Sequence, residues 1–368
     1  MRLSTSTVFL TGTTGLIGGE IARSLLEVPA QRLWAMARPD PNDTLAGRLA
    51  HRLGANGHGL EPWSRCLRPV SGDLTQPGLG LAPADAAEIG GEADCLIHCA
   101  GETSFVRGQA CRRTNVQGMQ HLLAFARGCQ RLQLLVYIST ATNCGKVSSC
   151  CLPESEASPA GMEHFNEYTR SKAEAEQLLR ASGLPVLIVR PSIVLSAGLL
   201  DKRFAMNILW CLPVLNLLEA APVDPASRLD IVTVRFVVES LLRLLQLSER
   251  RHTCYHLSAG QLGAVAFGRI AEFLDEFYNR GEPLKLIPPQ EWAASRRPWP
   301  PRTRPHREAA AKLRPYLPFL NMNTVFENRR LAAELGPAMP DNPELLSYLG
   351  TLLRQFSLED ALLAARNP

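Results

Sequence analysis

The sequence predicts an α/β fold in which a doubly wound parallel sheet is followed by a smaller, mostly helical C-terminal region. Two patterns carry this prediction. A glycine-rich turn joins an apolar run to an amphipathic stretch near the N-terminus, and later apolar runs end in small or polar residues. The 368 residues are enough for one large α/β domain with a smaller appendage. We expect the large domain to span residues 1–260 and the smaller region to span residues 261–368.

The glycine turn occupies residues 11–18, with the sequence Thr-Gly-Thr-Thr-Gly-Leu-Ile-Gly. The apolar residues 8–10 before it are typical of a strand, and the stretch from Ile17 to Leu26 repeats apolar residues at helical spacing. The three glycines of such a turn make the bend, let backbone approach a pyrophosphate and allow close helix packing, while the helix N-terminus offers N–H groups to the anion. The turn predicts a Rossmann-type dinucleotide site with contacts from Gly12, Thr14, Gly15, Leu16 and Ile17.

Tyr168 and Lys172 lie four residues apart in a stretch of helix formers that runs on to Leu179. This spacing places both side chains on one helical face. A lysine ammonium beside a phenol favours the phenolate. We therefore expect Lys172 to lower the pKa of Tyr168 from about 10 and make it a usable acid near neutral pH. For this pair alone, the alternative is a surface aromatic beside a solvated lysine.

The run from Leu134 to Thr142 has the pattern of a buried strand and ends in hydroxyl residues. Open parallel sheets place their chemistry at the carboxyl ends of their strands. The hydroxyl residues at this strand end are therefore candidates for the same site as Tyr168 and Lys172.

With its glycine turn, strand-end hydroxyl and Tyr-x-x-x-Lys pair in this order, the chain resembles the extended short-chain dehydrogenase/reductase superfamily over about residues 7–260. The resemblance implies that Thr140 is the catalytic Ser/Thr, with Ser139 as the second choice. It also implies that Tyr168 is the proton donor and that Lys172 holds the nicotinamide ribose. Asn115 matches a residue that usually supports the site structurally. The resemblance also implies that three further strand ends contribute cofactor contacts, from Asp73, Leu74, Ala100, Gly101, Pro191 and Ile193.

The end of the second predicted strand, which runs from Leu33 to Arg38, distinguishes the two nicotinamide cofactors. An acid about 20 residues past the glycines would bind the ribose 2′-hydroxyl of NAD, whereas an arginine suits the 2′-phosphate of NADP. Arg38 occupies this position, so the sequence favours NADPH. Asp40 lies two residues late for the NAD role, and that alternative stays open.

Composition narrows the function class further. A net charge of only +4 argues against a positive electrostatic field over the whole protein that would attract nucleic acid. The cysteines lack the paired C-x-x-C spacing of a zinc site, so no metal is expected.

The first apolar run is the first strand itself rather than part of a signal peptide, so we expect a cytoplasmic protein with reduced thiols. His98 and His164 suit packing or loop positions better than the role of a base.

The stretch from Leu199 to Val223 is unusually apolar for the connection after a sixth strand, and Pro213 interrupts it. It is too short and broken to span a bilayer, which needs about 20 apolar residues. Two interpretations stay open. It forms a pair of core helices, or it is a substrate insertion at about residues 199–225 that serves as a lid, a wall for an apolar substrate or an interfacial surface.

Later segments resemble one branch of the superfamily, which includes fatty acyl-CoA reductases and the terminal reductase domains of carrier-protein megasynthases. The segments are Leu229–Val238, Tyr255–Ser258, Thr103–Phe105, and Arg314–Leu320 with Phe326 and Asn328. Within Leu229–Val238 we expect a helix to open.

A proline-rich basic segment spans residues 296–314, with Glu308 as its single acid. Thioester substrates carry phosphates on coenzyme A or on the phosphopantetheine of an acidic carrier protein, and a basic rim would attract them. A solvated, partly disordered loop is the alternative.

The resemblance implies an NADPH-dependent reductase that converts an acyl thioester to an aldehyde and, with a second hydride, to an alcohol. A sugar-nucleotide epimerase or a hydroxysteroid-type dehydrogenase is the alternative enzyme, and a non-catalytic NADP-binding protein is the alternative from another class. Dehydration is disfavoured, because Ala141 and Thr142 follow Thr140 where dehydratases carry an Asp-Glu pair. Superfamily members often pair through helices of the nucleotide domain, which leaves a homodimer open.

Overall fold

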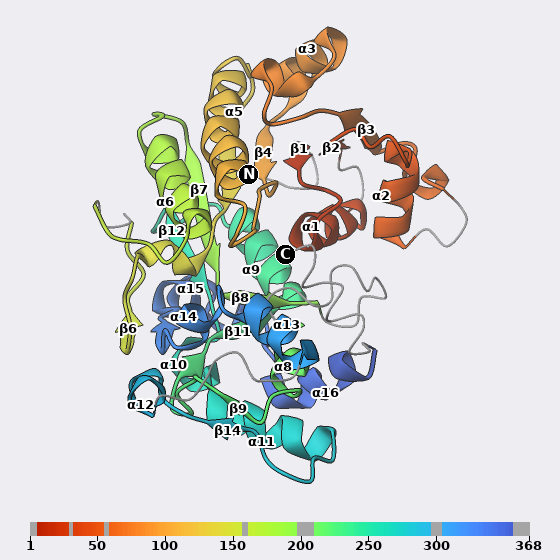
Figure 1. Ribbon diagram of the computed structural model, residues 1–368. Helices are drawn as coiled ribbons and strands as arrows, with labels where there is room; N and C mark the ends of the chain where they lie inside the picture. The colour runs from red at the N-terminus through yellow and green to blue at the C-terminus, as the bar shows by residue number, and fades with distance from the viewer. Residues whose placement is uncertain are drawn as a thin grey trace.

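A parallel sheet forms the centre of the molecule in the computed structural model, which describes residues 6–28, 32–54, 59–156, 161–196, 210–295 and 304–355. Within these ranges the sheet has seven strands in the order β12-β7-β5-β4-β1-β2-β3 (Figure 1). The order runs outward in both directions from β1 and β4, which confirms the predicted doubly wound sheet. The strands are β1 Thr7–Thr11, β2 Arg32–Ala37, β3 Leu67–Ser71, β4 Cys95–His98, β5 Leu134–Ile138, β7 Val186–Pro191 and β12 Cys254–Leu257.

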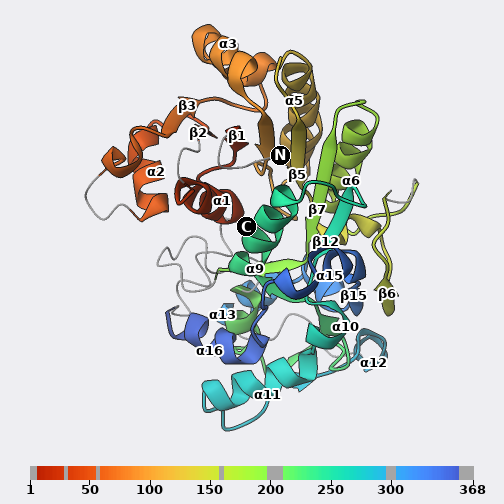
Figure 2. The same cartoon turned by 180° about the vertical axis from the view of Figure 1, so that it is seen from behind.

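Helices cover both faces of this sheet, as the two opposite views show (Figure 1 and Figure 2). One face packs against α1 Leu16–Leu26, α2 Leu45–Leu53 and α9 Val234–Gln246. The other packs against α3 Pro83–Glu92, α5 Gly118–Arg127 and α6 Glu167–Arg180. Because both faces are buried, the central strands are almost continuously apolar.

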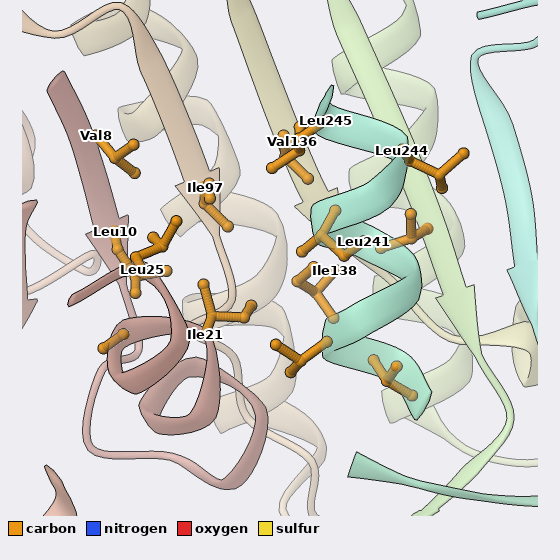
Figure 3. Packing of buried hydrophobic residues seen from close by; sticks show 14 of the residues in the cluster. Val8, Leu10, Ile21, Leu25, Ile97, Val136, Ile138, Leu241, Leu244 and Leu245 are labelled. Carbon is orange, nitrogen blue, oxygen red and sulfur yellow. The ribbon is translucent and has the colours of Figure 1, made fainter. Parts of the chain in front are cut away.

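Packing on the first face joins helices that lie far apart in the sequence. Figure 3 shows leucines of α9 facing β5, and apolar residues of α1 lying against β1 and β4. The labelled residues are Leu241, Leu244 and Leu245 against Val136 and Ile138, and Ile21 and Leu25 against Leu10 and Ile97.

Side-chain caps set the starts of two helices that matter for the site. Asn166 accepts a hydrogen bond from the Thr169 N–H at 3.0 Å and begins α6. Thr233 accepts one from the Phe236 N–H at 3.0 Å and begins α9. The helix expected to open within Leu229–Val238 therefore starts only at Val234. The residues before it form the short strands β10 Arg228–Leu229 and β11 Ile231–Thr233.

A second hydrophobic core lies below the sheet in Figure 1 and includes most of the described C-terminal helices. It buries the described half of the apolar stretch, Trp210 with α8 Cys211–Leu215, so these residues pack as core. Residues 199–209 lie outside the described residues. The helices around this core are α11 Phe267–Phe277, α13 Arg304–Leu313, α14 Leu317–Leu320 and α16 Leu345–Gln355.

Short strand pairs and two small helices complete the described part of the chain around this core and the sheet domain. The pairs are β8 Ile193–Leu195 with β11, β9 Ala220–Ala221 with β14 Lys285–Leu286, β10 with β13 Val265–Ala266, and β6 Cys150–Leu152 with β15 Thr324–Phe326. The helices are α12 Pro289–Ala294 and α15 Arg329–Leu335. Within the described ranges, no helix combines the length and apolarity needed to cross a membrane.

Candidate active site

The glycine turn after β1 is packed too closely for any larger residue at two positions. Gly12 has a φ of +78°, and a Cβ there would stand 2.6 Å from the backbone nitrogen of Ala100. A Cβ on Gly18 would stand 2.2 Å from the carbonyl oxygen of Gly12. The N-cap of α1 is Gly15, which has no side chain to cap the helix. The first turn of α1 is therefore suited to receive an anion.

A cavity of about 400 Å³ opens beside this turn, at the carboxyl ends of the sheet strands. Eight of the predicted cofactor residues line it: Gly12, Thr14, Gly15, Arg38, Asp73, Leu74, Ala100 and Gly101. The side chains of Leu16 and Ile17 pack into or against the hydrophobic core instead, so contacts from these two residues would come from their backbone. The cavity has the composition expected of a dinucleotide site, because its lining combines glycines with basic side chains.

Besides the predicted Arg38, the cavity lining includes Arg48 and Arg52, which were not predicted from the sequence. Arg38 is exposed directly after β2, and Arg48 of α2 donates a hydrogen bond to its carbonyl oxygen. The Nε of Arg48 is buried and has no hydrogen-bond partner. Arg52, one turn later, donates to the carbonyl oxygens of Gly15 at 3.0 Å and Leu16 at 2.6 Å. Asp40 also lines the cavity.

The arginines give this part of the cavity a positive charge that suits a phosphate group. An unpartnered guanidinium N–H beside an exposed arginine is a suitable environment for a phosphate group. The i, i+4 spacing of Arg48 and Arg52 on a helix after the second strand was a signal available in the sequence.

Thr140 and Tyr168 meet at the carboxyl end of β5. Thr140 caps the short 3₁₀ helix Ala141–Cys144, and its Oγ1 lies 2.8 Å from the Oγ1 of Thr142. Tyr168 is the second residue of α6, and its hydroxyl is hydrogen-bonded to that of Thr140. The helix cap at Asn166 places the tyrosine in this first turn, so local structure and sheet topology together produce the contact.

The pKa of Tyr168 differs from the sequence-based expectation. Burial raises it to about 12, and the hydrogen bond with Thr140 only partly opposes this effect. The expectation that Lys172 lowers this pKa is wrong for the protein alone, because the Lys172 ammonium is directed toward other groups. Tyr168 is therefore protonated at neutral pH, as a hydrogen-bond donor to an oxyanion must be.

Lys172 lies one turn after Tyr168, almost fully buried behind the cavity. Its Nζ donates a hydrogen bond to the carbonyl oxygen of Ile138 at 2.9 Å and lies 4.7 Å from the centroid of the Tyr137 ring. A Cβ on Gly101, in the cavity wall, would stand 3.5 Å from this Nζ. Burial lowers the pKa of Lys172 to about 8. The ammonium thus stands next to the predicted cofactor cavity, and its charge depends on pH near neutrality.

Ser139 points into a different network from its neighbour Thr140. The Asn143 amide donates hydrogen bonds to the Ser139 Oγ at 3.3 Å and to the Glu176 carboxylate at 2.6 Å. Glu176 also accepts two hydrogen bonds from the buried Arg190 guanidinium, at 2.9 and 2.5 Å. The backbone stays extended past the end of β5, with φ −152° and ψ 144° at Thr140, so the side chains of Ser139 and Thr140 face opposite sides.

Asn115 connects α6 to the loop after β4. Its Oδ1 accepts the Glu102 N–H at 2.8 Å, and its Nδ2 donates to the Glu102 carbonyl and to the Ser171 Oγ, both at 2.9 Å. Asn115 lies in a π-helical turn, Arg112–Gln117, a local distortion that is frequent at functional sites. Its placement agrees with the supporting role expected for it.

The remaining predicted residues lie at the adjoining strand end. Pro191 ends β7 opposite Leu257, and the Ile193 N–H donates to the Asp230 carbonyl oxygen at 3.1 Å. His98 is buried, its Nδ1 lies 2.9 Å from the Thr11 Oγ1, and burial lowers its pKa to about 3. His98 is therefore neutral and serves packing.

Comparison with known proteins agrees with this geometry. Residues 10–241, more than half of the chain, match the model of an NAD-binding family described as "Male sterility protein". The hybrid PKS-NRPS synthetase mpsA of Macrophomina phaseolina is 33% identical over 193 residues, which cover 50% of this chain and 4% of that synthetase. The PKS-NRPS hybrid synthetase cheA of Chaetomium globosum is 27% identical over 316 residues, which cover 78% of this chain and 6% of the relative. The chain thus spans a small part of these relatives.

Among solved structures, the terminal R domain from the myxalamid PKS-NRPS biosynthetic pathway superposes with a TM-score of 0.78 at 23% identity, covering 95% of this chain and 90% of that one. This likeness shows a shared fold. The family match, the doubly wound sheet and the glycine turn agree on one assignment: the chain belongs to the male sterility protein family, within the extended short-chain dehydrogenase/reductase superfamily of NAD(P)-binding oxidoreductases.

Proposed function

We propose that the protein is an NADPH-dependent reductase that converts an acyl thioester to an aldehyde and a thiol, with reduction to an alcohol as a second step. The observation that carries this proposal is the hydrogen-bonded pair of Thr140 and Tyr168. Tyr168 stands one helical turn from Lys172, whose ammonium lies behind Gly101 in the wall of the cavity. Two hydroxyls at one point can stabilise a carbonyl oxygen that is gaining negative charge.

The residues that would hold NADPH fall into three groups. The glycine turn and the backbone of Leu16 and Ile17 would bind the pyrophosphate, and Arg38 with Arg48 the 2′-phosphate. Asp73, Leu74, Ala100 and Gly101 would contact the adenine side and the middle of the cofactor. Lys172 would bind the nicotinamide ribose, with the backbone at Pro191 and Ile193 next to the amide. When bound, NADPH supplies the hydride.

Tyr168 and Thr140 would direct their hydroxyls at the thioester carbonyl. A pKa of about 12 keeps Tyr168 protonated, so it can donate to the oxygen as negative charge develops there. The carbonyl carbon gains a hydride and its oxygen gains a proton. The C–S bond of the resulting thiohemiacetal then breaks, and the departing thiolate takes the hydroxyl proton, which leaves aldehyde and thiol. The sum is thioester, NADPH and one proton giving aldehyde, thiol and NADP⁺.

The choice of a thioester rests on the relatives. The matching region of the curated relatives belongs to PKS-NRPS synthetases, and the R domain named above is the terminal domain of such a pathway. We propose that a carrier protein presents the acyl group. The exposed Arg307 and Arg314 would provide part of a basic rim for its phosphopantetheine, whereas residues 296–303 of the basic segment lie outside the described residues. All ten cysteines are unpaired thiols, which suits the cytosol.

The test is NADPH oxidation, followed by absorbance, with acyl-CoA thioesters and with the same acyl groups on a carrier protein. Mass spectrometry identifies the products. Thioester-dependent oxidation with an aldehyde or alcohol product supports the proposal and shows which carrier the protein uses. No turnover with any thioester, together with turnover of a sugar nucleotide or a hydroxysteroid, would replace the proposal with an epimerase or a dehydrogenase.

A further inference from the structure

A row of aromatic rings begins at Tyr168 and ends in the C-terminal region. The Phe105 ring stacks on the Tyr168 ring, with centroids 5.8 Å apart and an angle of 21° between the planes. It also stacks on Tyr316 at 4.8 Å and 20°, and it contacts Phe319 at 4.9 Å. Phe105, Tyr316 and Phe319 are called the aromatic bridge below. The bridge connects the candidate proton donor to the segment around α14.

The loop that carries Phe105 is fixed by its own polar groups. Glu102 accepts the N–H of Ser104 at 3.0 Å, and the Ser104 Oγ accepts the N–H groups of Val106 and Arg107 at 3.3 and 3.2 Å. Asn115 ties the same loop to Ser171 of α6, three residues from Tyr168. Phe105 and Tyr168 are therefore held against each other by one scaffold.

The opposite end of the bridge is equally well anchored. The Asn321 side chain, directly after α14, accepts the Asp224 N–H at 2.8 Å and donates to the Pro222 carbonyl at 3.0 Å. The Tyr316 ring meets Trp210 edge-on at 5.1 Å. Tyr316 and Phe319 are 5% and 7% exposed, whereas Phe105 and Tyr168 are only partly buried. Phe105 is thus the member of the bridge that a substrate can touch.

We propose that Phe105, backed by Tyr316 and Phe319, is the acyl-contact residue of this site and selects acyl groups that are apolar or aromatic close to the thioester carbonyl. This inference rests on the proposed function. A carbonyl that is hydrogen-bonded to Tyr168 must hold its substituents within a few bonds of that hydroxyl. The ring stacked on Tyr168 is therefore among the first surfaces that the acyl group meets.

The chemistry of the bridge determines which acyl groups it accepts. Apolar carbons and aromatic rings gain contact with the part of the Phe105 ring that Tyr168, Tyr316 and Phe319 leave exposed. A carboxylate at the same place would lose its hydration against rings whose faces carry partial negative charge. The bridge thus discriminates by acyl chemistry and does not require a binding pocket of fixed length.

The test compares three pantetheine thioesters: 3-phenylpropanoyl, octanoyl and succinyl. For the wild-type protein, we expect kcat/KM to be at least about tenfold lower with the succinyl thioester than with the other two. Phe105→Leu should lower kcat/KM for the 3-phenylpropanoyl thioester by about tenfold and for the octanoyl thioester by less. Phe105→Tyr, which keeps the ring, should restore the wild-type order. Phe277→Leu is a matched control, because Phe277 stacks on Phe273 at 5.8 Å within α11, away from Tyr168.

Binding of 3-phenylpropyl pantetheine thioether, which cannot be reduced, is measured by calorimetry with NADP⁺ present. Phe105→Leu should weaken it by a similar factor without changing the NADP⁺ affinity. Equal losses of kcat/KM for all three thioesters, with unchanged thioether binding, would overturn the inference. So would a wild-type protein that reduces all three equally well. If the thioether binds in a Phe105-dependent way but no thioester is reduced, the proposed function fails and the acyl-contact role stands.

Discussion

The Lys172 ammonium lies 4.7 Å from the centroid of the Tyr137 ring and donates to the carbonyl oxygen of the neighbouring residue, Ile138, at 2.9 Å. Tyr137 is itself fully buried and stacked on the neutral imidazole of His98 at 5.5 Å. A cation over the face of a buried ring is stabilised by the ring quadrupole. The charged state of Lys172 therefore depends on an aromatic residue in the strand beneath it.

This contact predicts a pH dependence. Because burial lowers the pKa of Lys172 to about 8, the ammonium loses its proton as pH rises through that value, and activity should fall there. Tyr137→Leu removes the ring, and a loss of about 1–2 kcal/mol should move this alkaline limb down by roughly 1 pH unit. Tyr137→Phe keeps the ring and should leave the limb in place. pH profiles of kcat/KM check this, and identical limbs for both variants would contradict it.

Tyr168→Phe should lower turnover by about 10²-fold, because the hydroxyl that donates to the carbonyl oxygen is lost. The affinity for NADPH should hardly change, since the hydroxyl is hydrogen-bonded to Thr140 and makes no cofactor contact in our proposal. Single-turnover kinetics and NADPH fluorescence separate the two quantities. Undiminished turnover would remove Tyr168 from the role of proton donor.

Arg38→Ala and Arg48→Ala should each weaken NADPH binding by about 10- to 100-fold, the loss expected for a charge-assisted hydrogen bond, while NADH binding stays nearly constant. Arg269→Ala is the control, because Arg269 is exposed on α11 and pairs there with Glu272. Calorimetric titration with both cofactors gives the ratio. Equal losses for NADPH and NADH would exclude a 2′-phosphate role.

Gly18→Ala should destabilise the glycine turn, because the new Cβ would stand 2.2 Å from the Gly12 carbonyl oxygen. We expect a loss of about 1–3 kcal/mol in the free energy of unfolding and much weaker cofactor binding. Gly91→Ala, on α3 with no atom within 4 Å of its Cβ, is the matched control. Chemical denaturation measures both variants, and equal stability would show that the turn can adjust.

Glu176→Gln should destabilise the fold by about 3–5 kcal/mol at pH 7, because the buried Arg190 would lose its counter-charge. Burial raises the pKa of Glu176, but the hydrogen bonds and charge of Arg190 outweigh it, so the net pKa is lowered. The stabilisation is therefore present above the unfolded pKa and is lost as pH falls through the folded pKa. Denaturation between pH 7 and 3 should show less acid sensitivity in the variant than in the wild type.

Local sequence determined much of this protein. The spacing of Gly12, Gly15 and Gly18, the hydroxyls after β5 and the four-residue interval from Tyr168 to Lys172 each belong to one strand end or one helix turn. Such features follow from backbone geometry over a few residues. They were sufficient to predict the doubly wound sheet, whereas the choice of Thr140 over Ser139 came from the resemblance to the superfamily.

Tertiary structure decided the pKa values and contacts that depend on residues far apart in the sequence. The pKa of Tyr168 rises instead of falling, because burial is set by the packing of the whole site and not by the nearest lysine. Arg48 reaches the cavity only because α2 lies beside the glycine turn. Phe105 meets Tyr316 and Phe319 across more than 200 residues of chain, and a contact of that kind leaves no periodicity in the sequence, because the fold alone brings the two segments together.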